Sequence, residues 1–306
     1  MIAKKSSLKP LIELMIANSF WGLGFVVTVF SLQAMSAPLL TSLRFGLAGI
    51  VGLFLSGVIF KKTVFDFFRE MRTAFPSGFF LAATLLLQTQ GLQLSTATKS
   101  AFITTLYVLI VPFFGWIWRR QRITGTHFLA VAVALVGTGL LVQIDRFQLG
   151  WGDAFLFANA VMAALHILAV DQATSKIHDA FLFNVCQCIW CAVLALFFVP
   201  LKFHFSLADW SWQVGLSLAS LAFGSSLIGF FLQVRAQRSL SPSVAAVLFL
   251  VEAPMSALFA YFLLREKLNL EQVFGAVLIL LAAGSLAFIS RAPPASEISS
   301  DTSKSV

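Results

Sequence analysis

Charged residues are scarce in this chain of 306 residues. Asp, Glu, Lys and Arg make up 11% of it, whereas a soluble globular domain carries about 25% charged residues. Apolar residues reach 59%. This balance excludes an ordinary water-soluble domain and favours a chain whose main solvent is lipid.

Groups for metal or covalent chemistry are also few. The four histidines lie on separate segments, at His127, His166, His178 and His204. No zinc-ligand spacing, no phosphate-binding Walker loop and no Gly-x-Ser-x-Gly nucleophile turn occurs in the sequence. We therefore expect no bound metal, no cofactor, no direct use of ATP and no enzymatic activity.

Long apolar stretches dominate the chain instead. Ten of them have about the 20 residues that a helix needs to cross the hydrocarbon core. They cover 11–30, 39–60, 77–95, 99–118, 125–144, 152–171, 181–200, 212–234, 243–264 and 271–290. A lipid-exposed backbone must satisfy its own hydrogen bonds, and no two-residue alternation is present. We predict an all-α membrane protein with ten transmembrane helices.

The positive charges are distributed unevenly between the loops. Of the 21 Lys and Arg residues, 15 fall in the N-terminal segment, the C-terminal segment and every second loop, and five fall in the other loops. This asymmetry predicts cytoplasmic termini and an even number of crossings. The basic start resembles a secretory signal, but its apolar stretch is too long for a signal core. The net charge of +8 therefore indicates a lipid bilayer, and not a nucleic acid, as partner.

Two segments of the chain share one pattern. Residues 97–124 and 239–269 each have a polar start, an apolar run with a central proline (Pro112, Pro254), a charged exit and a second apolar run. Ten spans divide into five plus five, so the second half starts on the opposite side from the first. We predict two five-helix inverted repeats, a design suited to alternating access. The expected divisions are a cytoplasmic segment 1–10, repeats 11–146 and 147–291, and a disordered cytoplasmic tail 292–306.

Several short motifs follow one another in a recognisable order. They are Phe20-Trp21-Gly22, Arg44-Phe45, GLQLSTATKSAF (91–102), LYVLIVP (106–112), Gly150-Trp151-Gly152-Asp153, Glu252-Ala253-Pro254 and the segment 264–268. In this order the chain resembles the drug/metabolite transporter superfamily, of the ten-helix type with two EamA domains. The family usually has a Glu-Arg-Leu-like exit after span 4, and this chain has arginines there instead. The resemblance implies an inner-membrane secondary carrier of metabolites, often an exporter.

Glu252 is the sharpest functional candidate in the sequence. It lies deep inside an apolar run, where an ionisable group is costly and marks a functional site by default. Pro254, two positions on, removes a backbone donor and leaves a carbonyl of the preceding turn without its usual partner. We assign coupling or gating to Glu252, Pro112 and Pro254. The alternative for Glu252 is a neutral, hydrogen-bonded side chain that bridges helices.

Other polar and aromatic side chains lie at mid-span. Together with Glu252, the expected substrate-binding residues are Asn18, Trp21, Gln88, Thr104, Tyr107 and His166. Asn159 lies seven residues before His166, on the same helix face. Ordinary helix packing is the alternative for each of them. Arg44 is expected to extend to the headgroups or to form an ion pair.

These observations favour a secondary active transporter in a bacterial inner membrane, with export as the expected direction. The solute would be a small amphipathic metabolite, an amino acid or a drug-like molecule, with a proton as a second partner. A phosphorylated sugar would require paired buried cations, which the spans lack. The alternatives are a non-transporting membrane scaffold, an intramembrane enzyme and a channel. No residue pattern specifies an oligomeric state.

Overall fold

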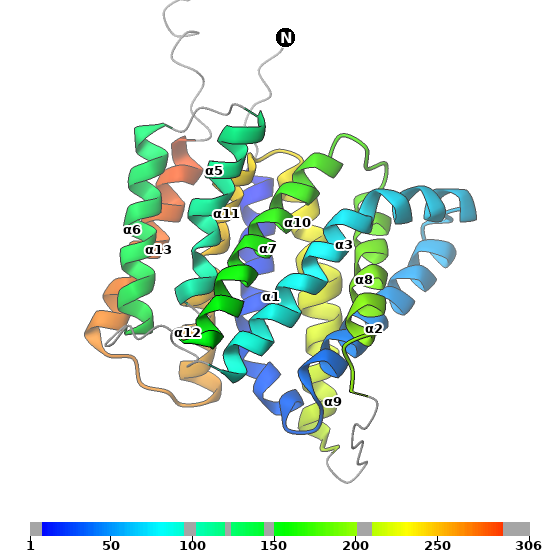
Figure 1. Ribbon diagram of the computed structural model, residues 1–306, viewed down its shortest axis with the longest axis horizontal. Helices are drawn as coiled ribbons and strands as arrows, with labels where there is room; N and C mark the ends of the chain where they lie inside the picture. Colours follow the sequence, from blue (N-terminus) through cyan, green and yellow to red (C-terminus); the bar gives the residue numbers. More distant parts are fainter. Residues whose placement is uncertain (1–7, 95–101, 120–123, 144–149, 201–209, 290–306) are drawn as a thin grey trace, which may run out of the picture.

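The computed structural model describes residues 8–94, 102–119, 124–143, 150–200 and 210–289, and these ranges contain helices and no strands. The expected tail 292–306 lies outside them. Figure 1 shows the helices as one bundle. Their bounds are α1 Lys9–Leu32, α2 Ala37–Val58, α3 Val64–Gln93, α5 Tyr107–Arg119, α6 Gly125–Val142, α7 Trp151–Ala173, α8 Ala180–Leu196, α9 Trp212–Ala219, η2 Ser220–Gly229, α10 Phe230–Gln237, α11 Pro242–Phe249, α12 Glu252–Leu263 and α13 Leu270–Ile289.

Seven helical segments of the described ranges are long and apolar enough to cross a membrane. Two of them are composite, since Trp212–Gln237 joins α9, η2 and α10, and Pro242–Leu263 joins α11 and α12. Helices also cover the other three expected spans, in α3 and in the shorter apolar segments Phe102–Ile117 and Ala180–Leu196. The all-helical prediction is therefore confirmed, and the count of ten crossings stays a prediction.

The start of α3 differs from the expected span, which began at residue 77. The helix begins at Val64, because Thr63 and Asp66 form a capping box. The Thr63 hydroxyl accepts the Asp66 N–H, and the Asp66 carboxylate accepts the Thr63 N–H at 3.1 Å. Phe65 and Phe68 are exposed in this first part of α3. The charged residues there kept this part of the helix out of the apolar stretch that the sequence analysis identified.

The pair α6 and α13 lies side by side at one edge of the bundle (Figure 1). A Cβ atom on Gly137 would meet the Gly275 carbonyl oxygen at 2.7 Å and the Ile279 side chain at 3.0 Å. Farther along α6, the Leu141 carbonyl accepts a hydrogen bond from Gln272 at 3.4 Å. Later positions of α6 thus meet earlier positions of α13. The two helices are antiparallel and approach backbone to backbone, which the small residues at this contact, Gly137 and Gly275, permit.

The pair α2 and α8 is antiparallel as well. Ser42 donates to the Ala192 carbonyl at 3.1 Å, and Gly49 faces Ile189. One helical turn later, Gly52 contacts Val185. The small residues of α2 therefore form a packing surface.

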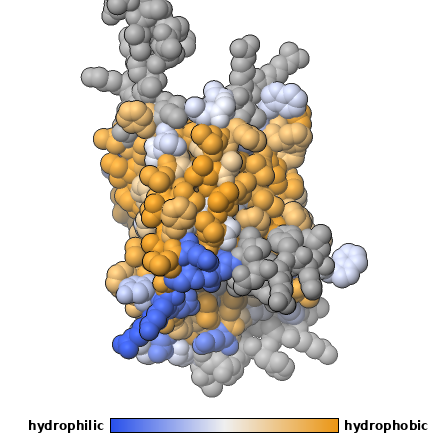
Figure 2. Space-filling model, turned by 90° about the vertical axis from the view of Figure 1, so that its left-hand side faces the viewer, coloured by the Kyte–Doolittle hydropathy of each residue, from blue (hydrophilic) through white to orange (hydrophobic). Residues whose placement is uncertain are grey.

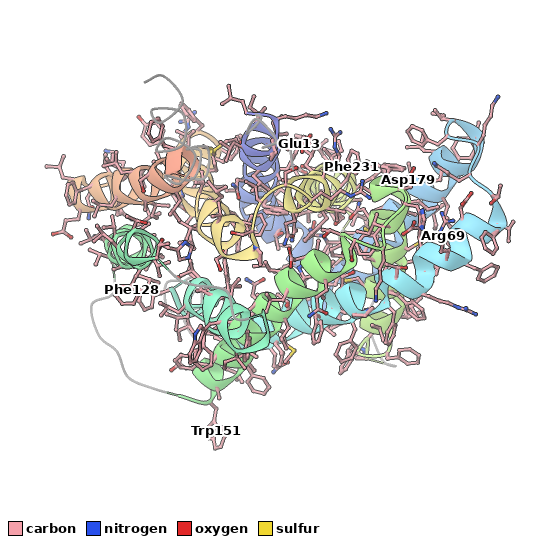
Figure 3. The ribbon with its side chains drawn as sticks, turned by 90° about the horizontal axis from the view of Figure 1, so that it is seen from above. Glu13, Arg69, Phe128, Trp151, Asp179 and Phe231 are labelled. Carbon is pink, nitrogen blue, oxygen red and sulfur yellow. The ribbon has the colours of Figure 1, made fainter. Side chains whose placement is uncertain are left out.

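Ion pairs join helix ends near the N-terminal end of α1. Arg235 on α10 pairs with Glu13 on α1 at 2.7 Å, and Lys62, before α3, pairs with Asp179, before α8, at 2.7 Å. Figure 3 shows Glu13 beside the helix of Phe231, and Asp179 toward Arg69. Partial burial acts to raise the pKa of Asp179, but Lys62 and backbone N–H groups outweigh it and hold that pKa below its usual range. The hydrogen bond from Lys62 to Asp179 in turn raises the pKa of Lys62.

The outer surface of the bundle is apolar. Figure 2 shows one face as a broad hydrophobic area, with hydrophilic residues gathered toward one end. Exposed side chains such as Phe128 at 67% and Leu281 at 62% belong to helices of this bundle. In Figure 3, Phe128 and Trp151 point away from it. Such a surface is stable against acyl chains and not against water.

The contact of α6 with α13 predicts opposite effects for two glycines of α13. Gly275→Ala places a Cβ against the Gly137 carbonyl, so the helices must separate, at a cost of about 1–3 kcal/mol. Gly284→Ala is the matched control, because Gly284 is exposed with nothing within 4 Å of an added Cβ. Alanine there should be neutral or stabilising. Thermal unfolding of purified protein in detergent measures both, and equal melting temperatures would contradict the close approach.

Candidate functional site

The span that contains Glu252 is interrupted at its centre. The helix α11 ends at Phe249, two turn residues follow, and α12 begins at Glu252. Pro254 has no N–H, so the Leu250 carbonyl instead accepts the Ala253 N–H at 3.2 Å. The interruption places Glu252, half-buried, at the start of a new helix.

Asn18 of α1 supplies a donor to this interruption. Its Nδ2 donates to the Leu248 carbonyl at 2.9 Å, and Asn18 is fully buried. Among the residues that the structure describes, the only other donor to that carbonyl is the Val251 N–H, at 3.3 Å. The Asn18 Oδ1 has no partner among the described residues. Asn18 therefore stabilises a backbone that the helix cannot satisfy by itself.

A related arrangement occurs in the first half of the chain. A turn at Leu106 precedes α5, and the buried Asn159 of α7 donates to the Thr104 hydroxyl at 2.8 Å. The Oδ1 of Asn159 is also buried, again without a described partner. Asn18 and Asn159 are almost as far apart in sequence as Pro112 and Pro254. In each half an asparagine thus donates to the proline-bearing span of the other half.

A π-helix in another span also accepts hydrogen bonds from side chains of neighbouring helices. The segment η2, Ser220–Gly229, widens the span between α9 and α10, and such segments often mark functional sites. Its Ser225 carbonyl accepts Trp21 Nε1 at 3.2 Å. Its Ser226 and Leu227 carbonyls accept Asn184 Nδ2 at 3.3 and 2.8 Å. Sequence reasoning missed Asn184, because its hydrogen-bond acceptors lie in the π-helix. The sequence of a π-helix has no pattern that distinguishes it from an α-helix.

Arg44 of α2 faces the same π-helix. Its Nε donates to the Ser226 hydroxyl at 3.0 Å, and its guanidinium lies 4.9 Å from the centre of the Phe45 ring. It also interacts electrostatically with Glu252, although the two do not form an ion pair in the described ranges. Glu252 interacts in the same way with Tyr107 of α5. Arg44 therefore points into the bundle, and neither expected role, extension to the headgroups or an ion pair, occurs among the described residues.

Aromatic rings connect these groups. Phe230, the first residue of α10, lies 5.2 Å from Trp21, 5.8 Å from Phe45 and 5.8 Å from His166 between ring centres. Trp21 lies 5.5 Å from Phe249, which ends α11 beside the interruption. Trp21 and Phe230 are both half-buried. The rings thus form a row from Arg44 to the start of α12, and we call it the aromatic row.

The structure brings most of the expected substrate-binding residues together. Asn18 and Trp21 contact α11 at the interruption, and Tyr107 packs in the same apolar cluster as the residues just before Glu252. His166 lies beside Phe230 of the aromatic row. Thr104 is linked to Asn159, on the other proline-bearing span. Gln88 does not join, because α3 packs mainly on α7 and α8. Pro112 lies inside α5.

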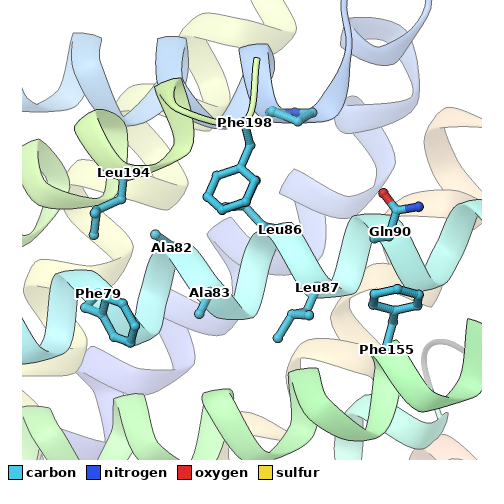
Figure 4. A pocket seen from close by; sticks show the side chains of 10 residues that line it. Phe79, Ala82, Ala83, Leu86, Leu87, Gln90, Phe155, Leu194 and Phe198 are labelled. Atoms are coloured by element: carbon cyan, nitrogen blue, oxygen red, sulfur yellow. The ribbon is translucent and has the colours of Figure 1, made fainter. Parts of the chain in front are cut away.

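A further cavity lies away from these residues. It is a groove of about 560 Å³ along α3 (Figure 4). Its lining is Pro38, Phe79, Ala82, Ala83, Leu86, Leu87, Gln90, Phe155, Leu194 and Phe198. None of the expected substrate-binding residues lines it. One amide among apolar side chains suits acyl chains better than a polar solute.

The contact of Asn18 predicts a loss of stability on truncation. Asn18→Ala leaves the buried Leu248 carbonyl with one long hydrogen bond, which should cost about 1–3 kcal/mol of unfolding free energy. Ser19→Ala is the control, since Ser19 bonds only to Met15 of its own helix and should change little. Melting temperatures in detergent compare the two. If both variants have the same melting temperature, Asn18 does not stabilise the interruption.

Comparison with known proteins agrees with this geometry. The EamA-like transporter family matches residues 8–143 and 150–288. A protein of Archaeoglobus fulgidus named "uncharacterized transporter" is 29% identical over 266 residues, covering 86% of this chain and 80% of the relative. A transporter of the same description from Methanothermobacter thermautotrophicus is 22% identical over 288 residues, covering 88% and 83%. A crystal structure with 17% identity superposes with a TM-score of 0.76 over 94% of this chain and 99% of its own, which shows a shared fold. The chain is thus a multi-pass membrane protein, and it belongs to the EamA-like transporter family.

Proposed function

We propose that this protein is a secondary active transporter that works by alternating access between two inverted five-helix repeats. The observation that carries the proposal is the pair of interrupted, proline-bearing spans, each held by an asparagine of the opposite half. Polar, interrupted backbone in lipid is tolerated only where protein or a water-filled space surrounds it. Such interruptions at matching places of two halves are the usual location of a transport site.

The direction of the helices supports the inverted relation of the halves. With ten spans, α6 is the fifth and α13 the tenth, while α2 is the second and α8 the seventh. Repeats of equal orientation would make the members of each pair parallel, and both pairs are antiparallel. We keep repeats 11–146 and 147–291, with ten crossings and both termini in the cytoplasm of a bacterial inner membrane.

The substrate site would lie around the interruption of α11 and α12. Asn18, Trp21, Tyr107 and Glu252 are the residues closest to it, with His166 behind the aromatic row. Gln88 and Thr104 would contribute to the path of the solute and not to this centre. The aromatic row favours a small amphipathic molecule, and we keep export as the direction. Glu252 is the group we assign to proton coupling, and the breaks near Pro112 and Pro254 are the sites of gating.

The proposal predicts the effect of neutralising one carboxyl group. Glu252→Gln keeps the size of the side chain but cannot exchange a proton, so transport should lose its pH dependence. Efflux of a defined mixture of amino acids and aromatic organic acids from proteoliposomes, measured by mass spectrometry between pH 6 and 8, tests this. Glu271→Gln is the control, because Glu271 is an exposed carboxyl at the start of α13.

The outcomes separate the competing functions. An unchanged pH profile in Glu252→Gln would remove proton coupling through this residue while leaving transport in place. The absence of any solute flux in the wild type would favour a scaffold or an intramembrane enzyme. Flux without saturation and without counterflow would favour a channel.

A further inference from the structure

We propose that Arg44 binds the carboxylate of an amphipathic organic acid, and that a proton on Glu252 makes Arg44 available to it. This inference rests on the proposed transport function and names the class of solute. It adds Arg44, which was expected from the sequence to extend to the headgroups or to form an ion pair, to the substrate site.

Arg44 has more donors than partners. A guanidinium carries five N–H groups in a planar fork. Only Nε is engaged, with the Ser226 hydroxyl, and the two terminal nitrogens make no hydrogen bond to the described residues. Ser226 of η2 contacts the side chain, and Cys188 and Cys191 of α8 and Glu252 of α12 lie within electrostatic range of it. The free edge of the fork matches a carboxylate, which accepts two parallel hydrogen bonds.

The protonation state of Glu252 determines when the terminal nitrogens of Arg44 can bind an anion. Apart from Arg44, the titratable groups that face this region are the thiols Cys188 and Cys191, the Tyr107 phenol and, behind Phe230, the His166 imidazole. A charged Glu252 balances Arg44 and repels a second anion. A protonated Glu252 removes the repulsion and leaves the positive charge uncompensated. The arriving carboxylate then restores neutrality, so proton binding and anion binding favour each other.

The surroundings select a carboxylate over a phosphate. A phosphate dianion would require a second cation, and among the described residues no other Lys or Arg interacts with Arg44 or Glu252. The aromatic row begins at Phe45, beside the guanidinium, and continues through Phe230 to Trp21. It offers flat apolar surface for the rest of the solute. An aryl or alkyl carboxylate satisfies both features.

Binding of matched acids and amides tests the proposal. The probes are 3-phenylpropionate, indole-3-acetate and octanoate, each with its carboxamide, bound to purified protein in detergent and followed by isothermal titration calorimetry. At pH 6 the wild type should bind at least one acid about ten- to hundred-fold more tightly than its amide. Arg44→Gln should remove this preference, and Arg44→Lys should retain part of it, because lysine keeps the charge but not the fork.

A second variant tests the role of Glu252 independently. In the wild type, affinity for the acid should fall as the pH rises from 6 to 8. Glu252→Gln mimics the protonated carboxyl, so it should bind the acid at pH 8 as tightly as the wild type does at pH 6. Arg72→Gln, which removes an exposed cation of α3 away from the site, is the control and should behave as the wild type.

The failures of the two proposals are distinguishable. Equal binding of acids and amides, failure of every acid to bind, or full acid binding by Arg44→Gln would overturn the role of Arg44. Saturable flux of an uncharged solute alongside any of these results would leave the transport function standing. If no solute crosses or binds, both proposals fail together.

Discussion

The architecture depends on how a broken backbone is satisfied where water is absent. A transmembrane helix that stops at Phe249 and restarts at Glu252 leaves carbonyls that lipid cannot hydrogen-bond. The Asn18 amide from α1 supplies the missing donor at Leu248. In the π-helix, the indole of Trp21 and the amide of Asn184 play the same part. These side chains allow irregular backbone, and with it a polar site, in the centre of the bundle.

Because the donors come from other helices of the chain, each break is stabilised by the packed bundle and not by its own span. Asn18 belongs to the first half and reaches the proline-bearing span of the second, while Asn159 does the reverse. The two contacts are not identical, since one acceptor is a carbonyl and the other the Thr104 hydroxyl. The alternating access that we propose would require such a difference between the halves at any moment. Identical halves would place the site equally close to both sides.

Much of the fold was predictable, and the reasons for the exceptions are physical. Apolar runs of membrane length predict helices reliably, because lipid leaves the backbone few alternatives. The extension of α3 back to Val64 depends on a capping box between Thr63 and Asp66, which hydropathy does not detect. The π-helix has no pattern of its own, so Asn184 and the orientation of Arg44 were missed. Asn18, Trp21 and Glu252 were found because polar or ionisable groups deep in lipid require an explanation. Gln88 met the same criterion without joining them.

The ion pairs at the helix ends have a consequence for the environment of the protein. Glu13 with Arg235, and Lys62 with Asp179, tie together neighbouring helix ends at the same side of the bundle. Each pair is partly exposed, so dissolved ions and anionic lipid headgroups compete for its members. Under the proposed alternating access, a passage that opens on that side would require such ties to loosen. The ionic composition of the adjoining water layer, and the lipids around it, would thereby set how much time the molecule spends open toward that compartment.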